Sequence, residues 1–102
     1  MAQVLTVFRS RLRPEGLEAY LELNPKVTEL AKSMPGFVES KSFEAPDGER
    51  ITVVVFADRA SHNAWRDHPE HQAAKRRGLA EFYDEFSTTV ALVEVEHRWQ
   101  RS

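Results

Sequence analysis

The chain has 102 residues, 41% of them hydrophobic and 29% charged, which is typical of a globular protein. This length predicts one domain over residues 1–102, able to bury about 65% of the surface of its unfolded chain. Fourteen Lys and Arg against sixteen Asp and Glu leave a net charge of −2, which excludes the strong positive field of a nucleic-acid-binding protein. The sequence has no cysteine, so disulfides, thiolate nucleophiles and iron–sulfur clusters are excluded. Because no apolar run approaches about 18 residues and no charged-then-apolar leader precedes the chain, we expect a cytoplasmic protein with no membrane partner.

The first half of the chain predicts a strand, a helix and a second strand. Val, Leu and Phe side chains indicate a strand over residues 3–11. Apolar positions at helical spacing predict a helix over residues 15–34, and Pro25 inside it predicts a kink or two helical pieces. A second strand is expected over residues 37–45. The sequence Pro46-Asp47-Gly48 then predicts a turn, because proline presets φ and glycine accepts a positive φ.

The second half predicts a strand over residues 50–57, followed by helices and a last strand. Ser61 is expected to cap a short helix that ends at Asp67. Pro69 suits the first turn of the next helix, which is expected to end at Tyr83 or Phe86. A long fourth strand is predicted over residues 88–99. The order βαββαβ is the ferredoxin-like arrangement of the α+β class, with two helices on one face of a four-stranded antiparallel sheet.

The other face of this sheet is expected to be covered as well. Residues 51–56 and 90–93 are almost continuously apolar, whereas a strand with one wet face alternates polar and apolar residues. A chain of this length has no further element to cover that face. We therefore expect a symmetric homodimer in which the two sheets pack together, with Val54 and Leu92 meeting the partner.

The densest group of chemically useful side chains is residues 61–71, Ser-His-Asn-Ala-Trp-Arg-Asp-His-Pro-Glu-His. His62 is expected to be an exposed residue of a first helical turn. His68 and His71 straddle a proline and do not match the zinc-protease pattern H-x-x-E-H, so we expect no metal site. No glycine-rich phosphate loop is present, and no serine lies in a G-x-S-x-G elbow. The composition of this segment instead indicates acid–base chemistry beside an indole.

From Met34 to Trp99 the chain resembles the antibiotic biosynthesis monooxygenase domain family. The residues that carry the resemblance are Pro35-Gly36-Phe37, Val53-Val54-Val55-Phe56, Trp65-Arg66-Asp67-His68-Pro69-Glu70-His71, Gly78, Phe82-Tyr83 and Val90. The resemblance implies a dimeric α/β barrel. The members of this family include small quinol or anthrone monooxygenases and haem-degrading oxygenases. Lys75 stands where the haem degraders carry a histidine, ten residues after the tryptophan.

We therefore interpret the chain as a cofactor-independent monooxygenase that acts on a small aromatic quinol or anthrone with O₂. His68 or His71 is the expected base, with a preference for His71, because imidazole titrates near neutral pH. Trp65 offers an N–H donor and a flat face for an aromatic substrate. Tyr83 and Arg66 are expected to orient or stabilise a phenolate. The alternatives are a haem-binding or haem-degrading protein and a non-catalytic small-molecule-binding dimer, with Trp65 in the core and His68 as a helix cap.

Overall fold

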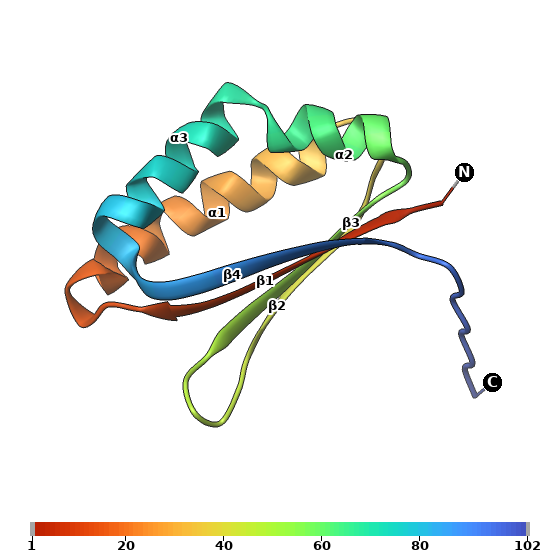
Figure 1. Cartoon of the computed structure of the whole chain (residues 1–102). Helices are drawn as coiled ribbons and strands as arrows, with labels where there is room; N and C mark the ends of the chain where they lie inside the picture. Colours follow the sequence, from red (N-terminus) through yellow and green to blue (C-terminus); the bar gives the residue numbers. More distant parts are fainter. Residues whose placement is uncertain (1, 102) are drawn as a thin grey trace.

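The structure is a computed structural model that describes residues 2–101. The four strands form one antiparallel sheet in the order β2-β3-β1-β4, and the helices lie on one side of it (Figure 1). This confirms the predicted ferredoxin-like fold. The elements in chain order are β1 (Val4–Leu12), the 3₁₀ turn η1 (Pro14–Gly16), α1 (Leu17–Ser33), β2 (Phe37–Glu44), β3 (Arg50–Phe56), α2 (Arg59–Arg66), α3 (Pro69–Arg77), the π-helical turn η2 (Gly78–Phe82) and β4 (Tyr83–Leu92).

Two local expectations have opposite outcomes. The turn at residues 46–48 is confirmed, because Gly48 has a φ of 91° and its N–H donates to the carbonyl of Ala45 at 2.9 Å. The prediction of a helix in two pieces at Pro25 is wrong, since α1 is a single helix with Pro25 inside it. The proline removes one backbone donor, but Tyr20 and Ala31 anchor the helix on both sides of it by burial.

Helix α2 begins three residues earlier than predicted, because its cap is Asp58 rather than Ser61. The Asp58 carboxylate accepts the Ser61 N–H at 2.8 Å. This bond to the backbone of Ser61, with a second one from the Ser61 side chain, lowers the pKa of Asp58. An aspartate ahead of the first turn satisfies an amide that has no carbonyl partner within the helix.

The predicted boundaries of the last helix and last strand are wrong. Strand β4 spans Tyr83–Leu92 instead of residues 88–99, so Tyr83 and Phe86 are strand residues. The helical stretch ends in η2, where a Cβ at Gly78 would lie only 2.5 Å from the Tyr83 ring. At its other end β4 pairs with β1 as far as Val4, opposite Leu92.

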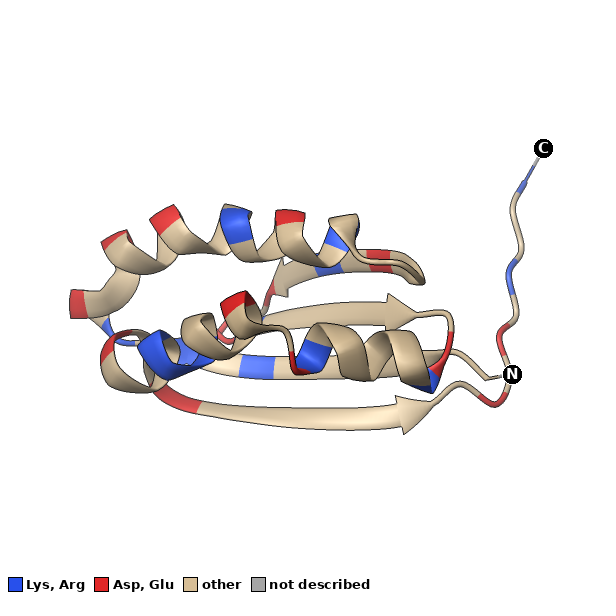
Figure 2. Ribbon diagram, turned by 90° about the horizontal axis from the view of Figure 1, so that it is seen from above, with Lys and Arg blue, Asp and Glu red and all other residues tan. Residues whose placement is uncertain are grey.

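The sheet has a helix-covered face and an open face, and alternate residues of each strand belong to different faces. Ala31, Val54, Phe56 and Trp65 form the buried core between the helices and the sheet. Figure 2 shows α1 beside the α2–α3 pair above the strands, with charged residues of both signs on the helices.

Val54 and Leu92 therefore do not lie where they were expected. Val54 belongs to the helix-side core, and Leu92 lies opposite Val4, which shares the parity of the helix-facing positions of β1. No helix covers the opposite, open face within residues 2–101. Its apolar residues, by alternation and register, are Leu5, Val7, Phe43, Ile51, Val53, Val55 and Ala91, of which Val55 is buried.

The overall dimensions exceed those of a closed globule of this size. The accessible surface is 7236 Å², against about 5,900 Å² from area scaling. The radius of gyration is 14.4 Å, against about 13 Å for a compact chain of this length. Part of the excess is the segment after Leu92, which leaves the sheet (Figure 1) and exposes Val95 and Trp99. Within the described residues, none of the helices combines the length and apolarity needed to cross a bilayer.

Candidate functional site

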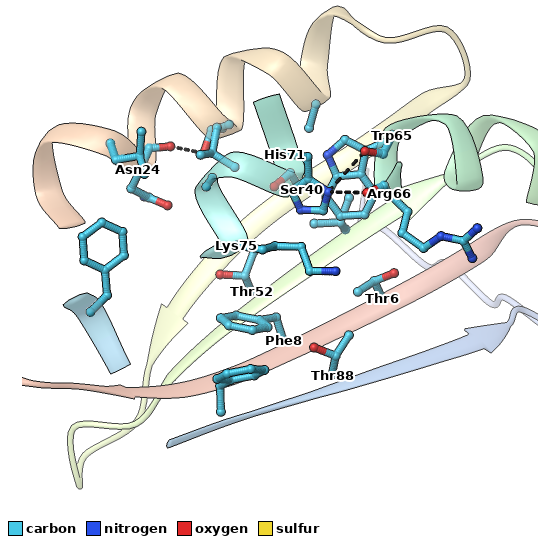
Figure 3. Close-up of a pocket in the computed structure, with 18 of the residues that line it drawn as sticks. Thr6, Phe8, Asn24, Ser40, Thr52, Trp65, Arg66, His71, Lys75 and Thr88 are labelled. Atoms are coloured by element: carbon cyan, nitrogen blue, oxygen red, sulfur yellow. Dashed lines mark hydrogen bonds between the residues drawn. The ribbon is translucent and has the colours of Figure 1, made fainter. Parts of the chain in front are cut away.

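A cavity of about 260 Å³ lies between the helices and the covered face of the sheet. Its roof is mostly apolar, with Leu23, Val27 and Ala31 from α1 and Ala74 from α3. Its floor carries one hydroxyl residue from each strand, and Figure 3 labels these residues: Thr6, Ser40, Thr52 and Thr88. An apolar enclosure with a few polar groups is typical of a small-molecule site.

The floor hydroxyls are separated by apolar side chains. In the sheet register Thr6 lies opposite Val54 on one side and Val90 on the other. Phe8 likewise lies between Thr52 and Thr88. This alternation lets a flat ring lie on methyl and phenyl surface while its oxygen atoms find hydroxyl partners.

Trp65 forms one wall of the site and is 7% exposed. Its indole is stacked between Phe56, with ring centroids 5.2 Å apart, and His71, at 4.4 Å. Both faces of the indole are thus occupied, contrary to the expectation that one face would receive an aromatic substrate. The indole Nε1–H is buried and has no acceptor among the described residues. The chemistry that remains for Trp65 is hydrogen-bond donation.

His71 is held in one tautomer at the cavity wall. Its Nδ1 lies 3.2 Å from the carbonyl oxygens of both Trp65 and Arg66, so Nδ1 carries the proton and donates it (Figure 3). Nε2 is then the nitrogen with the free lone pair, and nothing within residues 2–101 donates to it. Burial lowers the pKa of His71, against the opposing effect of its hydrogen bonds to backbone carbonyls. The imidazole is therefore neutral at pH 7 and has the form that a general base requires.

His68, the other expected base, does not line the cavity. It is the N-cap residue of α3, and its Nδ1 accepts the N–H of Glu70 at 3.1 Å. The alternative interpretation of His68 as a helix cap is thus confirmed. The residue before a proline has extended backbone, which turns this side chain back toward the helix start.

Arg66 lies at the edge of the cavity, but its guanidinium is engaged elsewhere. Nε and Nη2 donate to the two carboxylate oxygens of Asp67 at 2.9 and 3.0 Å. The side chain extends away from the labelled floor residues in Figure 3. What Arg66 gives to the site is its backbone carbonyl, which helps to orient His71.

Tyr83 lines the cavity from the first position of β4. Its ring meets Phe8 edge-on with centroids 5.4 Å apart. Burial raises the pKa of Tyr83 to about 12, with a further contribution from nearby Tyr20. The phenol therefore keeps its proton at neutral pH and is a potential hydrogen-bond donor.

His62 and Lys75, neither of which was an expected site residue, also line the cavity. His62 is 4% exposed rather than exposed. Its Nδ1 lies 3.0 Å from Asn63 Oδ1 and its Nε2 lies 3.1 Å from Thr6 Oγ1. The helical spacing of His62 and Trp65 was the signal that both would face inward.

No group of three or more His, Asp or Glu side chains in residues 2–101 is arranged to hold a metal ion. A haem, in the alternative interpretation, would be held by His71, whose Nε2 is the free imidazole nitrogen of this wall and would be available to an iron ion.

Comparison with known proteins identifies the family. The family model described as antibiotic biosynthesis monooxygenase matches residues 3–77. The chain belongs to the antibiotic biosynthesis monooxygenase family. One relative is the uncharacterized protein YqjZ of Bacillus subtilis, which is 33% identical to this chain over 96 residues. The matched residues cover 94% of this chain and 84% of YqjZ.

Solved structures share the fold of this antibiotic biosynthesis monooxygenase domain at low sequence identity. Rv0793 from Mycobacterium tuberculosis is 17% identical with a TM-score of 0.84, over 95% of this chain and 100% of that one. SnoaB from Streptomyces nogalater, a cofactor-independent oxygenase solved as the mutant N63A, is 13% identical with a TM-score of 0.80, over 94% and 97% of the two chains. These similarities establish the fold of the domain.

Proposed function

We propose that this protein is a monooxygenase that oxidises an electron-rich aromatic compound, a quinol, phenol or anthrone, with O₂ and without a cofactor. The observation that carries the proposal is His71, a neutral imidazole with a fixed tautomer and a free Nε2 at the wall of an apolar cavity. Family membership and the similarity to a cofactor-independent oxygenase support the same reaction class.

The reaction begins with a proton transfer. Nε2 of His71 takes a proton from the substrate hydroxyl, or from the methylene of an anthrone, and leaves an electron-rich anion. The anion passes one electron to O₂, and the resulting substrate radical and superoxide combine to form a C–O bond. The imidazolium of His71 then returns its proton to the terminal oxygen of the peroxide.

The second stage releases water. The carbon that bears the hydroperoxide loses its remaining proton to the base, and its C–H electron pair forms the new C=O bond as the O–O bond breaks. The departing hydroxide takes the proton from the base and leaves as water. One oxygen atom of O₂ thus enters the product and the other becomes water, with two hydrogens removed from the substrate.

The other groups of the site stabilise the anion. The hydroxyl of Tyr83 is a donor for the oxygen on which negative charge develops. The Nε1–H of Trp65, which has no acceptor and no accessible surface in the free protein, becomes a second donor once the side chains that cover it move. The apolar roof keeps water from the peroxide, which would otherwise decompose without transferring oxygen. Arg66 has no part in this scheme beyond its carbonyl bond to His71.

We further propose that the protein is a homodimer in which two open sheet faces pack together. The supporting observations are the half-buried apolar residues Leu5, Val7 and Val53 on that face and the excess of accessible surface over a closed monomer. Val95 and Trp99, on the segment that leaves the sheet, add apolar surface available to a partner. An obligate homodimer of this kind buries more than about 2,000 Å² in total.

The test of the activity is oxygen uptake by purified protein with a panel of naphthols, quinols and anthrones, followed by mass analysis of the product formed under ¹⁸O₂. We expect uptake that depends on substrate, one labelled atom in the product and no effect of EDTA. Uptake abolished by EDTA, or two labelled atoms in the product, would contradict the proposal. A sharp Soret band on titration with hemin, with no uptake from the panel, would favour the haem alternative. Binding of aromatic compounds without uptake would favour the non-catalytic module.

A further inference from the structure

The charges around the cavity are unbalanced. Its lining includes two cationic residues, Arg66 and Lys75, and no Asp or Glu. Arg66 is neutralised by Asp67 at 2.9 Å. The ammonium of Lys75 has neither a hydrogen bond nor an ion pair with any of the described residues. Figure 3 shows the Lys75 side chain extending from α3 into the space above the floor residues.

Lys75 follows His71 by one helical turn on α3. Residues four apart on a helix have Cβ atoms about 5–6 Å apart and project from the same side. The cation is thus next to the proposed base. The Lys75 charge also contributes to the lowered pKa of His71, which places the ammonium within electrostatic range of the imidazole.

We propose that the substrate of this site is an aromatic hydroxy acid, whose carboxylate is bound by Lys75 while the neighbouring hydroxyl faces Nε2 of His71. The inference rests on the proposed monooxygenase function and adds the substrate class to it. An unpaired ammonium at an apolar cavity without carboxylates attracts an anion and repels a cation.

Lys75 determines which substrates bind in this proposal, because it holds the carboxylate at the mouth of the cavity. Its side chain as a whole is exposed. The carboxylate then stays at the wet rim, and the aromatic ring occupies the space between the apolar roof and the hydroxyl floor. This arrangement avoids the large cost of burying both members of an ion pair.

The test compares 1-hydroxy-2-naphthoate with its methyl ester, using calorimetry on the wild-type protein, Lys75→Met and Lys75→Arg. The wild type is expected to bind the acid about tenfold or more tightly than the ester, the size of one charged hydrogen bond. Lys75→Met should lose this preference without weakening the ester, and Lys75→Arg should retain it. Arg76→Met, an exposed cation of the same helix that does not line the cavity, is the matched control and should behave as the wild type.

The two proposals fail differently. Equal affinity of the wild type for acid and ester, no binding of either, or a preference that survives in Lys75→Met would overturn the inference. Oxygen uptake from neutral naphthols that is unaffected by Lys75→Met would leave the monooxygenase standing without it. A Lys75-dependent preference for the acid, with no oxygen uptake from any compound, would support the binding inference and overturn the monooxygenase.

Discussion

The two faces of the sheet differ in polarity: at its centre, the face beneath the helices is the more polar one and the open face is the more apolar one. The centre of the face beneath the helices carries the hydroxyls of Thr6, Thr52 and Thr88 and surrounds a cavity. The open face carries Val7 and Val53 at the corresponding positions. In an antiparallel sheet with one wet face, the apolar residues are expected on the covered side.

The difference assigns a separate task to each face. The hydroxyls of Thr6 and Thr52 are already hydrogen-bonded, to His62 and Ser42, so they do not carry the cost of unpaired buried polar groups. What indicates a ligand site is the mostly apolar cavity that these hydroxyls line. Uncovered valines are most readily explained by a partner that covers them. In this account one face carries the chemistry and the other carries the assembly, and substitutions on each should have separable effects.

The largest effect is expected from His71→Ala. Removal of a general base lowers turnover by about 10²–10⁴-fold. His68→Ala is the matched control, because His68 caps α3 outside the cavity, and it should keep its turnover while losing at most about 1 kcal/mol of stability. Steady-state oxygen uptake and urea unfolding separate the two outcomes. Equal turnover of the two variants would show that His71 is not the general base.

On the open face, Val53→Asp is expected to abolish the dimer. A carboxylate at this position would be buried without a partner in the interface, which costs about 3–5 kcal/mol, whereas in a monomer it would contact water. The variant should therefore sediment as a folded monomer at micromolar concentration. Leu21→Asp, on an exposed position of α1, is the control and should remain a dimer. A dimeric Val53→Asp protein would show that this face is not the interface.

Within the cavity, Trp65→Phe tests whether the indole N–H takes part in the reaction. Phenylalanine keeps an aromatic ring between Phe56 and His71 but removes the unpaired Nε1–H. Loss of a hydrogen bond to a developing anion should lower kcat by about 10–100-fold. Stability should fall as well, because phenylalanine leaves part of the volume of this buried indole empty, so kcat is compared under conditions where both proteins are folded. Unchanged kcat would remove Trp65 from the chemistry.

The smallest effect is a pH dependence that originates in His71. Its pKa in the folded protein lies below 6.5, so the unfolded chain binds more protons than the folded one at acid pH. The contribution to stability is complete above about pH 6.5 and is lost as pH falls from there through the folded pKa. His71→Gln should therefore flatten the stability difference between about pH 7.5 and pH 5 in urea titrations. A wild-type kcat/KM profile that rises with pH, with a midpoint below 6.5, is the kinetic counterpart.

The order of elements could be predicted from the sequence, but the orientation of β3 could not. Residues 51–56 are apolar on both faces, and the one polar residue among them, Thr52, faces the cavity. With valines at both parities, nothing in this strand showed that Val54, which shares the parity of Thr52, lies on the helix side. The polarity of a functional cavity is indistinguishable from that of a wet surface in a single strand.

Long-range contacts explain the other misplacements. His62 is buried against the sheet, where its ring forms a hydrogen bond with Thr6, a residue 56 positions away in the sequence. The end of β4 at Leu92 follows from the start of its partner strand at Val4, not from the composition of the segment that follows. Trp65 and His71, close in sequence and on adjoining helices, were the part of the site that local spacing could identify.

The free Nε2 of His71, facing an aromatic ligand, is the central claim, and ring-nitrogen NMR of ¹⁵N-histidine-labelled protein tests it most directly. At neutral pH the account predicts a neutral His71 ring protonated at Nδ1, with an Nε2 resonance that shifts when a naphthol is added. His68, outside the cavity, should not respond to the same ligand. A His71 ring protonated at Nε2, or an Nε2 resonance unchanged by a ligand that is bound, would contradict the account.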